Sequence, residues 1–203
     1  MLSHLPFDEN IFIDADTLVY GDITSFFSYF PMKGVKHFGK AYPVDTKGKG
    51  WFDAEDIGKW GEKIHFCIYS YGGIIFASND ECTKQIYDTS IEILTHYFDY
   101  SFREFPKPSD EPIMALAMSI HNNPPIEENW LGTKCFYRVE KALSEVNVNK
   151  GLLAYSSKWN GKKYFNVLLL HIGTAETKQW LYKSEILRLK GNKWYWFYKK
   201  TIR

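Results

Sequence analysis

The chain has few cysteines, almost no net charge and no long apolar run. Cys67, Cys82 and Cys135 lie far apart and form no Cys-x-x-Cys pair, which argues against a zinc module and against a disulfide framework. The formal net charge is +1 and no basic run lies near the start, so we expect no nucleic-acid partner. No segment reaches the roughly 18 consecutive apolar residues of a membrane span, and residues 1–8 lack the basic start and apolar stretch of a signal peptide. We therefore expect a cytoplasmic protein.

Hydrophobic side chains make up 45% of the 203 residues. A chain of this length and composition buries a full core as one domain or a little more, which argues against a disordered protein.

Two aspartates separated by one residue follow a short apolar run near the start. Residues 11–13 predict a buried strand that ends at Asp14 and Asp16. Side chains at i and i+2 of an extended backbone point to the same side, so we expect the two carboxylates to share one small volume. Two like charges held that close need a cation, and hard carboxylate oxygens favour Mg²⁺ or Mn²⁺ completed by substrate phosphates. The expected ligand is therefore a nucleotide diphosphate.

A histidine has the same placement late in the chain. Residues 152–156 and 164–170 predict two strands of a hairpin, because Asn160-Gly161 between them favours a tight turn. The second strand is apolar and ends on His171. Two interpretations are open for this histidine: a satisfied structural residue, or a third metal ligand beside the two aspartates.

Gly72 and Gly73 interrupt an apolar stretch that predicts strands over residues 65–70 and 74–77. A glycine pair between strands marks a bulge or a tight turn. It also suits a position where a sugar lies against the backbone and no side chain is tolerated. Both interpretations are kept.

Two helices are predicted in the middle of the chain. The first runs from Glu81 to about Tyr97, and its predicted core face consists of Ile86, Ile93, Leu94 and Tyr97. The second begins after Ser109, with Asp110 and Glu111 in its first turn, where the helix dipole favours acids. Acids at this position need no function, but carboxylates also suit sugars because they accept hydrogen bonds from hydroxyl groups.

In their order along the chain these segments resemble the GT-A-fold glycosyltransferases, especially the branch with glycogenin and the bacterial lipopolysaccharide galactosyltransferases. Residues 12–19, with Gly21-Asp22-Ile23, resemble the DxD region of the family, and residues 71–73 resemble its Asn-x-Gly stretch. Asp110-Glu111 resembles its Asp-Gln/Glu element. Residues 171–180 resemble its late His-x-x-Gly-x-x-Lys-Pro-Trp segment, with the glycine one residue early, the lysine one residue late, and Gln179 in place of proline.

The resemblance implies a GT-A-like α/β fold with a mixed sheet flanked by helices, as a single catalytic domain over residues 1–203. In the family the metal-binding pair follows two or three βαβ units of roughly 30 residues each, whereas here it begins at position 14. We therefore expect an N-terminally truncated domain that corresponds to the C-terminal portion of the full fold. Its central parallel sheet would have an unpaired edge, which favours self-association.

The resemblance also implies an activity: Mn²⁺-dependent (or Mg²⁺-dependent) transfer of a sugar from a nucleotide-sugar donor, a UDP-sugar, to a glycan or lipid-linked acceptor. The implied metal ligands are Asp14, Asp16 and His171. The implied catalytic residues, which bind the transferred sugar, are Asp110 and Glu111. The implied contacts with the donor are made by Asp14, Ala15, Gly72, Gly73, Gly173 and Lys178.

Residues 182–203 form a basic-aromatic tail with two open interpretations. They predict a last hairpin strand that turns at residues 190–193 and packs its rings on the core, or a peripheral contact with the inner membrane face. Two other functions are also weighed. One is a catalytically silent domain that binds sugar or a partner. The other is a haloacid-dehalogenase-type phosphatase, against which Leu18 and the lack of an adjacent Asp pair argue.

Overall fold

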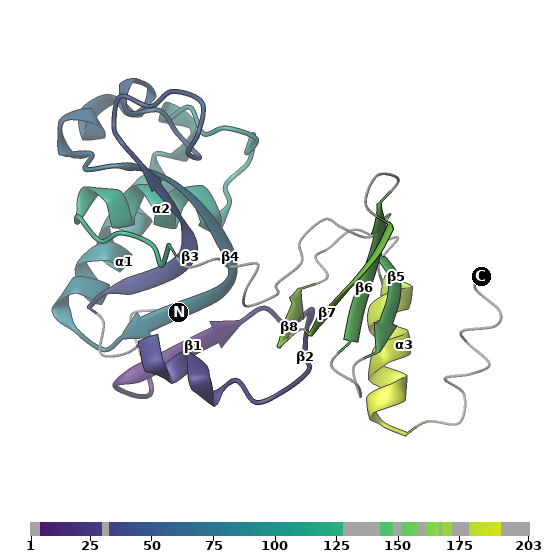
Figure 1. Cartoon of the computed structure of the whole chain (residues 1–203). Coiled ribbons are helices and arrows are strands. Elements are labelled where there is room, and N and C mark those ends of the chain that lie inside the picture. The colour runs from purple at the N-terminus through teal and green to yellow at the C-terminus, as the bar shows by residue number, and fades with distance from the viewer. Residues whose placement is uncertain are drawn as a thin grey trace. The chain divides into compact units, whose positions relative to one another are not determined.

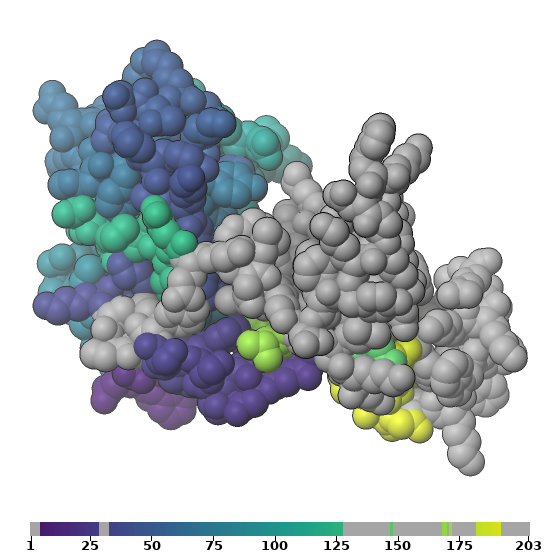
Figure 2. Space-filling model, viewed as in Figure 1, coloured from purple at the N-terminus to yellow at the C-terminus, as the bar shows by residue number. Residues whose placement is uncertain are grey.

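Figure 1 shows the computed structural model of the chain, which describes residues 5–29, 33–127, 143–147, 152–157, 161–166, 168–171 and 179–191. Figure 2 shows one face of the molecule as a space-filling view, with residues of uncertain placement in grey. The chain is a mixed α/β protein with antiparallel sheets and helices. Its contacts group into two compact units: unit 1 comprises Met1–Ile13 and Phe27–Glu128, and unit 2 comprises Asp14–Phe26 and Asn129–Arg203. That the two form a single GT-A-like catalytic domain stays a prediction.

Unit 1 contains a three-stranded sheet in the order β1-β4-β3, formed by β1 (Glu9–Ile13), β3 (Val35–Tyr42) and β4 (Cys67–Ser78). Both pairings are antiparallel, so the expected central parallel sheet is wrong for the described strands. The connections between these strands carry the 3₁₀ helices η1 (Thr24–Tyr29) and η2 (Ala54–Lys63). Parallel neighbours need longer crossovers, usually through an α-helix, and here both α-helices of the unit follow β4.

The glycine pair lies inside β4, which is one continuous strand and not two. Its register with β3 changes between two neighbouring residues, because His37 lies opposite Ile75 and Phe38 lies opposite Tyr71. Residues 72–74 therefore have no partner in that ladder and form a bulge. The bulge interpretation of Gly72 and Gly73 is confirmed.

Two α-helices pack with this sheet, α1 (Glu81–Thr95) and α2 (Asp110–Ile120), and the short η3 (Tyr97–Asp99) follows α1. Asp80 caps α1 by accepting a hydrogen bond from the Thr83 N–H at 2.8 Å. Leu94 is 45% exposed, so its predicted place on the core face is wrong. The buried stripe runs through Ile86 and Ile93, and a rotation of about 100° per residue turns Leu94 away from it.

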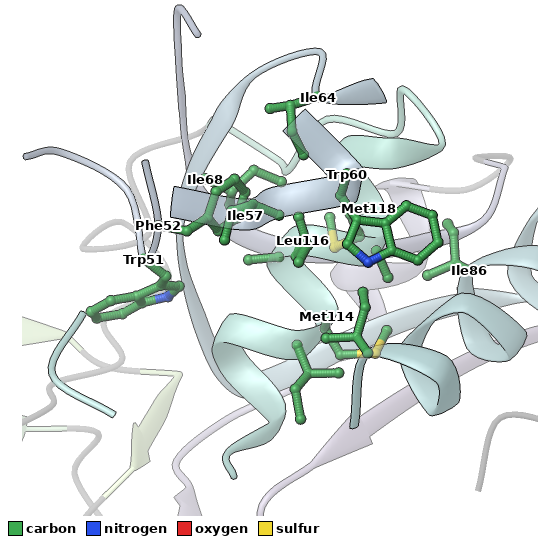
Figure 3. Close-up of a cluster of buried hydrophobic side chains, with 14 of the residues drawn as sticks. Trp51, Phe52, Ile57, Trp60, Ile64, Ile68, Ile86, Met114, Leu116 and Met118 are labelled. Atoms are coloured by element: carbon green, nitrogen blue, oxygen red, sulfur yellow. The ribbon is translucent and has the colours of Figure 1, made fainter. Parts of the chain in front are cut away.

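The core of unit 1 gathers side chains from the segment before η2, from η2 itself, and from β4, α1 and α2 (Figure 3). Nearly the whole of α2 is buried, which agrees with its apolar sequence. The labelled core side chains are Trp51, Phe52, Ile57, Trp60, Ile64, Ile68, Ile86, Met114, Leu116 and Met118. Unit 1 is thus stabilised by a continuous apolar cluster to which its sheet and its helices contribute side chains.

Unit 2 contains two small sheets and one helix. The first sheet pairs β2 (Thr17–Val19) with β8 (Leu169–His171), and the second has the order β5-β6-β7. The strands of the second sheet are β5 (Leu143–Asn147), β6 (Leu152–Ser157) and β7 (Gly161–Asn166). The predicted hairpin is confirmed, because β6 and β7 pair antiparallel up to Ser157 opposite Gly161. The strand predicted over residues 164–170 is divided between β7 and β8.

The helix of unit 2 is α3 (Gln179–Leu189), so the strand predicted from residue 182 is wrong over the described part of the tail. Residues 183–189 are mainly Lys, Glu, Leu and Arg, which favour helix over strand. Gly191 follows the helix with φ 61°, a conformation that favours glycine at a helix end. Residues 192–203 lie outside the described part. Among the helices described, none is long and apolar enough to cross a lipid bilayer.

Candidate metal centre

The two aspartates lie in a reverse turn between β1 and β2. The Thr17 N–H donates a hydrogen bond to the Asp14 carbonyl at 3.0 Å, which closes the turn over residues 14–17. The extended backbone expected from the sequence is therefore wrong at this point. Aspartate is a common turn residue because its short side chain tolerates turn conformations. The turn itself, and not a strand, carries the two carboxylates.

The pairing of β2 with β8 brings the histidine to this turn (Figure 1). His171 lies opposite Thr17, and Leu170 lies opposite Leu18. One residue before the start of β2 is Asp16, so the end of β8 reaches the aspartates directly. A further hydrogen bond, from the Tyr20 N–H to the Leu168 carbonyl at 2.8 Å, continues the ladder. Antiparallel register thus joins two segments that are distant in the sequence.

The three side chains converge on one small volume. The His171 Nε2 atom lies 2.9 Å from Asp16 Oδ1 and 3.2 Å from Asp14 Oδ2. One ligand atom from each residue lies within 4.8 Å of the others. Ligands that bind one ion at about 2.1 Å and at right angles lie about 3 Å apart, so the two measured distances suit neighbouring positions around a single divalent ion. The expected convergence of the three side chains is confirmed.

Exposure rises across the group from the histidine to the first aspartate. The side chain of His171 is 9% exposed, that of Asp16 is 32% exposed and that of Asp14 is 50% exposed. An ion would be anchored by the imidazole on the protein side and would face solvent on the other. Magnesium-like sites keep several positions for water and substrate phosphates, and this gradient leaves them room.

The same distances also suit an ion pair between a protonated imidazole and two carboxylates. A metal ion needs the nitrogen lone pair that this proton occupies, so proton and metal compete for His171. Both interpretations of the histidine therefore place it against the same two aspartates. They differ in whether an ion can displace the proton.

The residues expected to bind the donor sugar lie in unit 1. Glu111 Oε1 accepts a hydrogen bond from the Gly72 N–H at 2.9 Å, so two of these residues contact each other. A Cβ on Gly72 would lie 2.9 Å from Glu111 Cγ, which gives a structural reason for glycine at this position. Gly73 is buried in β4. Asp110 is exposed at the start of α2, where its Oδ1 accepts hydrogen bonds from the Glu111 N–H at 3.0 Å and the Ser109 hydroxyl at 3.4 Å.

Two residues that sequence reasoning missed stand out. Tyr182 donates a hydrogen bond from its hydroxyl to the Ala15 carbonyl at 2.9 Å, and Ala15 separates the two aspartates. His37 is fully buried in β3, and neither ring nitrogen has a hydrogen-bond partner among the described residues. Burial lowers the pKa of His37 to about 4, and the charge of Asp110 offsets part of this lowering. The sequence around each residue carries no motif that marks it.

Two expected donor contacts, Gly173 and Lys178, lie outside the described residues. Comparisons with protein-family models, curated proteins and solved structures found no match to this chain.

Proposed function

We propose that this chain is a metal-dependent glycosyltransferase with a GT-A-like fold, which moves a sugar from a UDP-sugar to a glycan or lipid-linked acceptor. The observation that supports the proposal is the convergence of Asp14, Asp16 and His171. The motif resemblance requires these residues to meet, although they are far apart in the sequence. An accidental match of four short motifs would not require the late histidine to lie against the early aspartates.

The donor set suits the proposed ion. The group offers hard oxygen ligands from two carboxylates and one nitrogen ligand from an imidazole. Mn²⁺ binds both kinds of ligand, and Mg²⁺ binds the oxygens. Asp16 and His171 would hold the ion, and Asp14 would bind it directly or through the ribose of the donor. A divalent ion held there would neutralise the charge that develops on the leaving diphosphate.

The other predicted residues complete the proposal. Asp110 and Glu111, with the backbone of Gly72 and Gly73, would position the transferred sugar through hydrogen bonds to its hydroxyl groups. Gly173 and Lys178 would contact the diphosphate. An acceptor hydroxyl would then attack the anomeric carbon of the donor sugar, and the bond between that carbon and the diphosphate would break.

The test is release of UDP from a panel of UDP-sugars by the whole chain, with Mn²⁺ and with a chelator. Mn²⁺-dependent release from one sugar supports the proposal. No turnover and no Mn²⁺-dependent binding of UDP would overturn the proposal and favour the catalytically silent domain, and phosphate release from phosphomonoesters alone would favour the phosphatase class.

The cellular setting is part of the same proposal. A cytoplasmic protein whose basic-aromatic tail, residues 182–203, touches the inner membrane face would meet lipid-linked acceptors there. Sedimentation of the chain with vesicles that contain anionic lipid tests this contact. Recovery of the chain in the supernatant at low salt would contradict it.

A further inference from the structure

Helix α3 is bonded to the turn that carries the two aspartates. The hydroxyl of Tyr182 donates to the carbonyl of Ala15 at 2.9 Å. The hydrogen bond that closes the turn uses the Asp14 carbonyl and the Thr17 N–H, so it does not involve the Ala15 carbonyl. Tyr182 therefore gives the middle of the turn an attachment that the turn lacks on its own.

The same helix also reaches the chain beyond β2. Glu185 is 2% exposed, and its Oε1 lies 3.4 Å from Arg188 Nη2. The charges of both residues act on Tyr20, whose pKa is raised by burial and by Glu185 and lowered by Arg188. Tyr20 follows β2 directly. Thus α3 touches the segment before β2 at Ala15 and lies close to it after β2 at Tyr20.

The position of the Ala15 peptide governs the two carboxylates, because Asp14 and Asp16 are its neighbours on either side. A metal ion demands ligand atoms at fixed distances, and partners behind the ligands maintain that arrangement. Rotation of the Ala15 peptide would move both carboxylates relative to His171. An attachment at this peptide therefore acts on two of the three candidate ligands together.

We propose that Tyr182 is a positioning residue of the metal centre, which holds the Asp14-Ala15-Asp16 turn in the arrangement that a divalent cation requires. Its hydroxyl acts through Ala15 and is not itself a ligand. The inference rests on the proposed metal binding by Asp14, Asp16 and His171.

The test compares two phenylalanine substitutions. Tyr182→Phe removes only the hydroxyl that bonds to Ala15. Tyr20→Phe is the matched control, because its hydroxyl is buried near the same helix and has no hydrogen-bond partner among the described residues. Far-UV circular dichroism of both variants checks that each one folds.

Hydrogen exchange without metal gives the first readout. Tyr182→Phe should speed exchange of the Thr17 amide about five-fold, the effect expected when one supporting hydrogen bond is lost. Tyr20→Phe should leave the rate at the wild-type value. An unchanged rate in Tyr182→Phe would overturn the inference.

Electron paramagnetic resonance titration with Mn²⁺ gives the second readout. Tyr182→Phe should weaken Mn²⁺ binding about ten-fold, at the lower end of the effect of partners behind metal ligands, and should broaden the spectrum of the bound ion. Equal affinity and an equal spectrum in the two variants would overturn the inference and leave the proposed function standing. A wild-type chain that binds no Mn²⁺ would overturn both.

A third measurement needs no variant. If Tyr182 couples the turn to α3, Mn²⁺ should slow hydrogen exchange of residues 182–188 in the wild-type chain, because coupling between two sites is reciprocal. The exchange of α1 in unit 1 is the internal reference. Mn²⁺ binding that leaves the exchange of α3 unchanged would contradict the positioning role.

Discussion

Thr17 and His171 lie opposite each other in the antiparallel pair of β2 and β8. This register puts the imidazole beside the turn over residues 14–17. The candidate metal centre is therefore assembled from two chain segments. A shift of the pairing by one residue would turn His171 to the other face of the pair. The centre therefore depends on three residue pairs, and its ligands can be tested one at a time.

Removal of the imidazole should abolish specific Mn²⁺ binding. His171→Ala deletes the buried ligand, and the loss should exceed the roughly 10–100-fold that outer partners of a metal site cost. Isothermal titration with Mn²⁺ measures it, and His65→Ala, at an exposed histidine of unit 1, is the control. Retained affinity in His171→Ala would leave only the structural interpretation of this histidine.

The two aspartates should contribute unequally. Asp16 is less exposed than Asp14 and lies nearer to His171 Nε2, so Asp16→Asn should weaken Mn²⁺ binding more than Asp14→Asn. Asp45→Asn, at an exposed aspartate elsewhere, should have no effect. The three affinities come from the same titration, and an equal loss in Asp45→Asn would show that only net charge matters.

The buried imidazole of His37 should make the fold acid-sensitive. Its pKa is about 4 in the folded chain, against about 6.5 when exposed, so the unfolded chain binds this proton more readily between those values. The free energy of unfolding should therefore fall by about 3 kcal/mol as the pH drops from about 6.5 to about 4. Urea unfolding at several pH values measures this loss.

The control for that measurement is a pair of leucine variants. His37→Leu removes the buried imidazole and should lose less stability on acidification than the wild type. His65→Leu removes an exposed histidine and should follow the wild-type curve. Parallel curves for the wild type and His37→Leu would assign the acid sensitivity to other groups.

The close contact with Glu111 should make glycine necessary for stability at position 72, whether or not a sugar binds. A Cβ at Gly72 would lie 2.9 Å from Glu111 Cγ, so Gly72→Ala should cost about 1–3 kcal/mol of stability through overpacking. In a Glu111→Ala background the same substitution should cost less stability, because Glu111 Cγ is absent. A double-mutant cycle by urea unfolding measures the coupling. Additive losses would show that the close contact with Glu111 is not the reason for glycine.

Sequence reasoning predicted the parts of the candidate site that end apolar strands. Asp14 and Asp16 follow one apolar run and His171 follows another, so their chemistry could be read from local patterns. The conformation between the aspartates could not, because an i, i+2 spacing fits a turn as well as a strand. The antiparallel sheet of unit 1 also escaped prediction, since strand direction depends on how distant segments pair, whereas Asn160-Gly161 marked the hairpin of β6 and β7.

Contacts between side chains of different elements were the least predictable. The hydrogen bond from the Gly72 N–H to the Glu111 carboxylate joins a strand bulge to a helix, and no local pattern in either segment predicts it. Tyr182 was grouped with a basic-aromatic tail, because its residue type suits a strand or a membrane surface as well as a helix. The role of its hydroxyl depends on the hydrogen bond to the Ala15 carbonyl, which only the folded structure shows.

The pair of β2 and β8 has only three residues in each strand, so its own hydrogen bonds can contribute little to holding residues 14–19 against residues 169–171. An ion shared by Asp14, Asp16 and His171 would act as a removable clasp between these segments. At a free ion concentration 100 times the dissociation constant, such a clasp adds about 2.7 kcal/mol to folding. The melting temperature of unit 2 would then rise with the concentration of the free ion in solution.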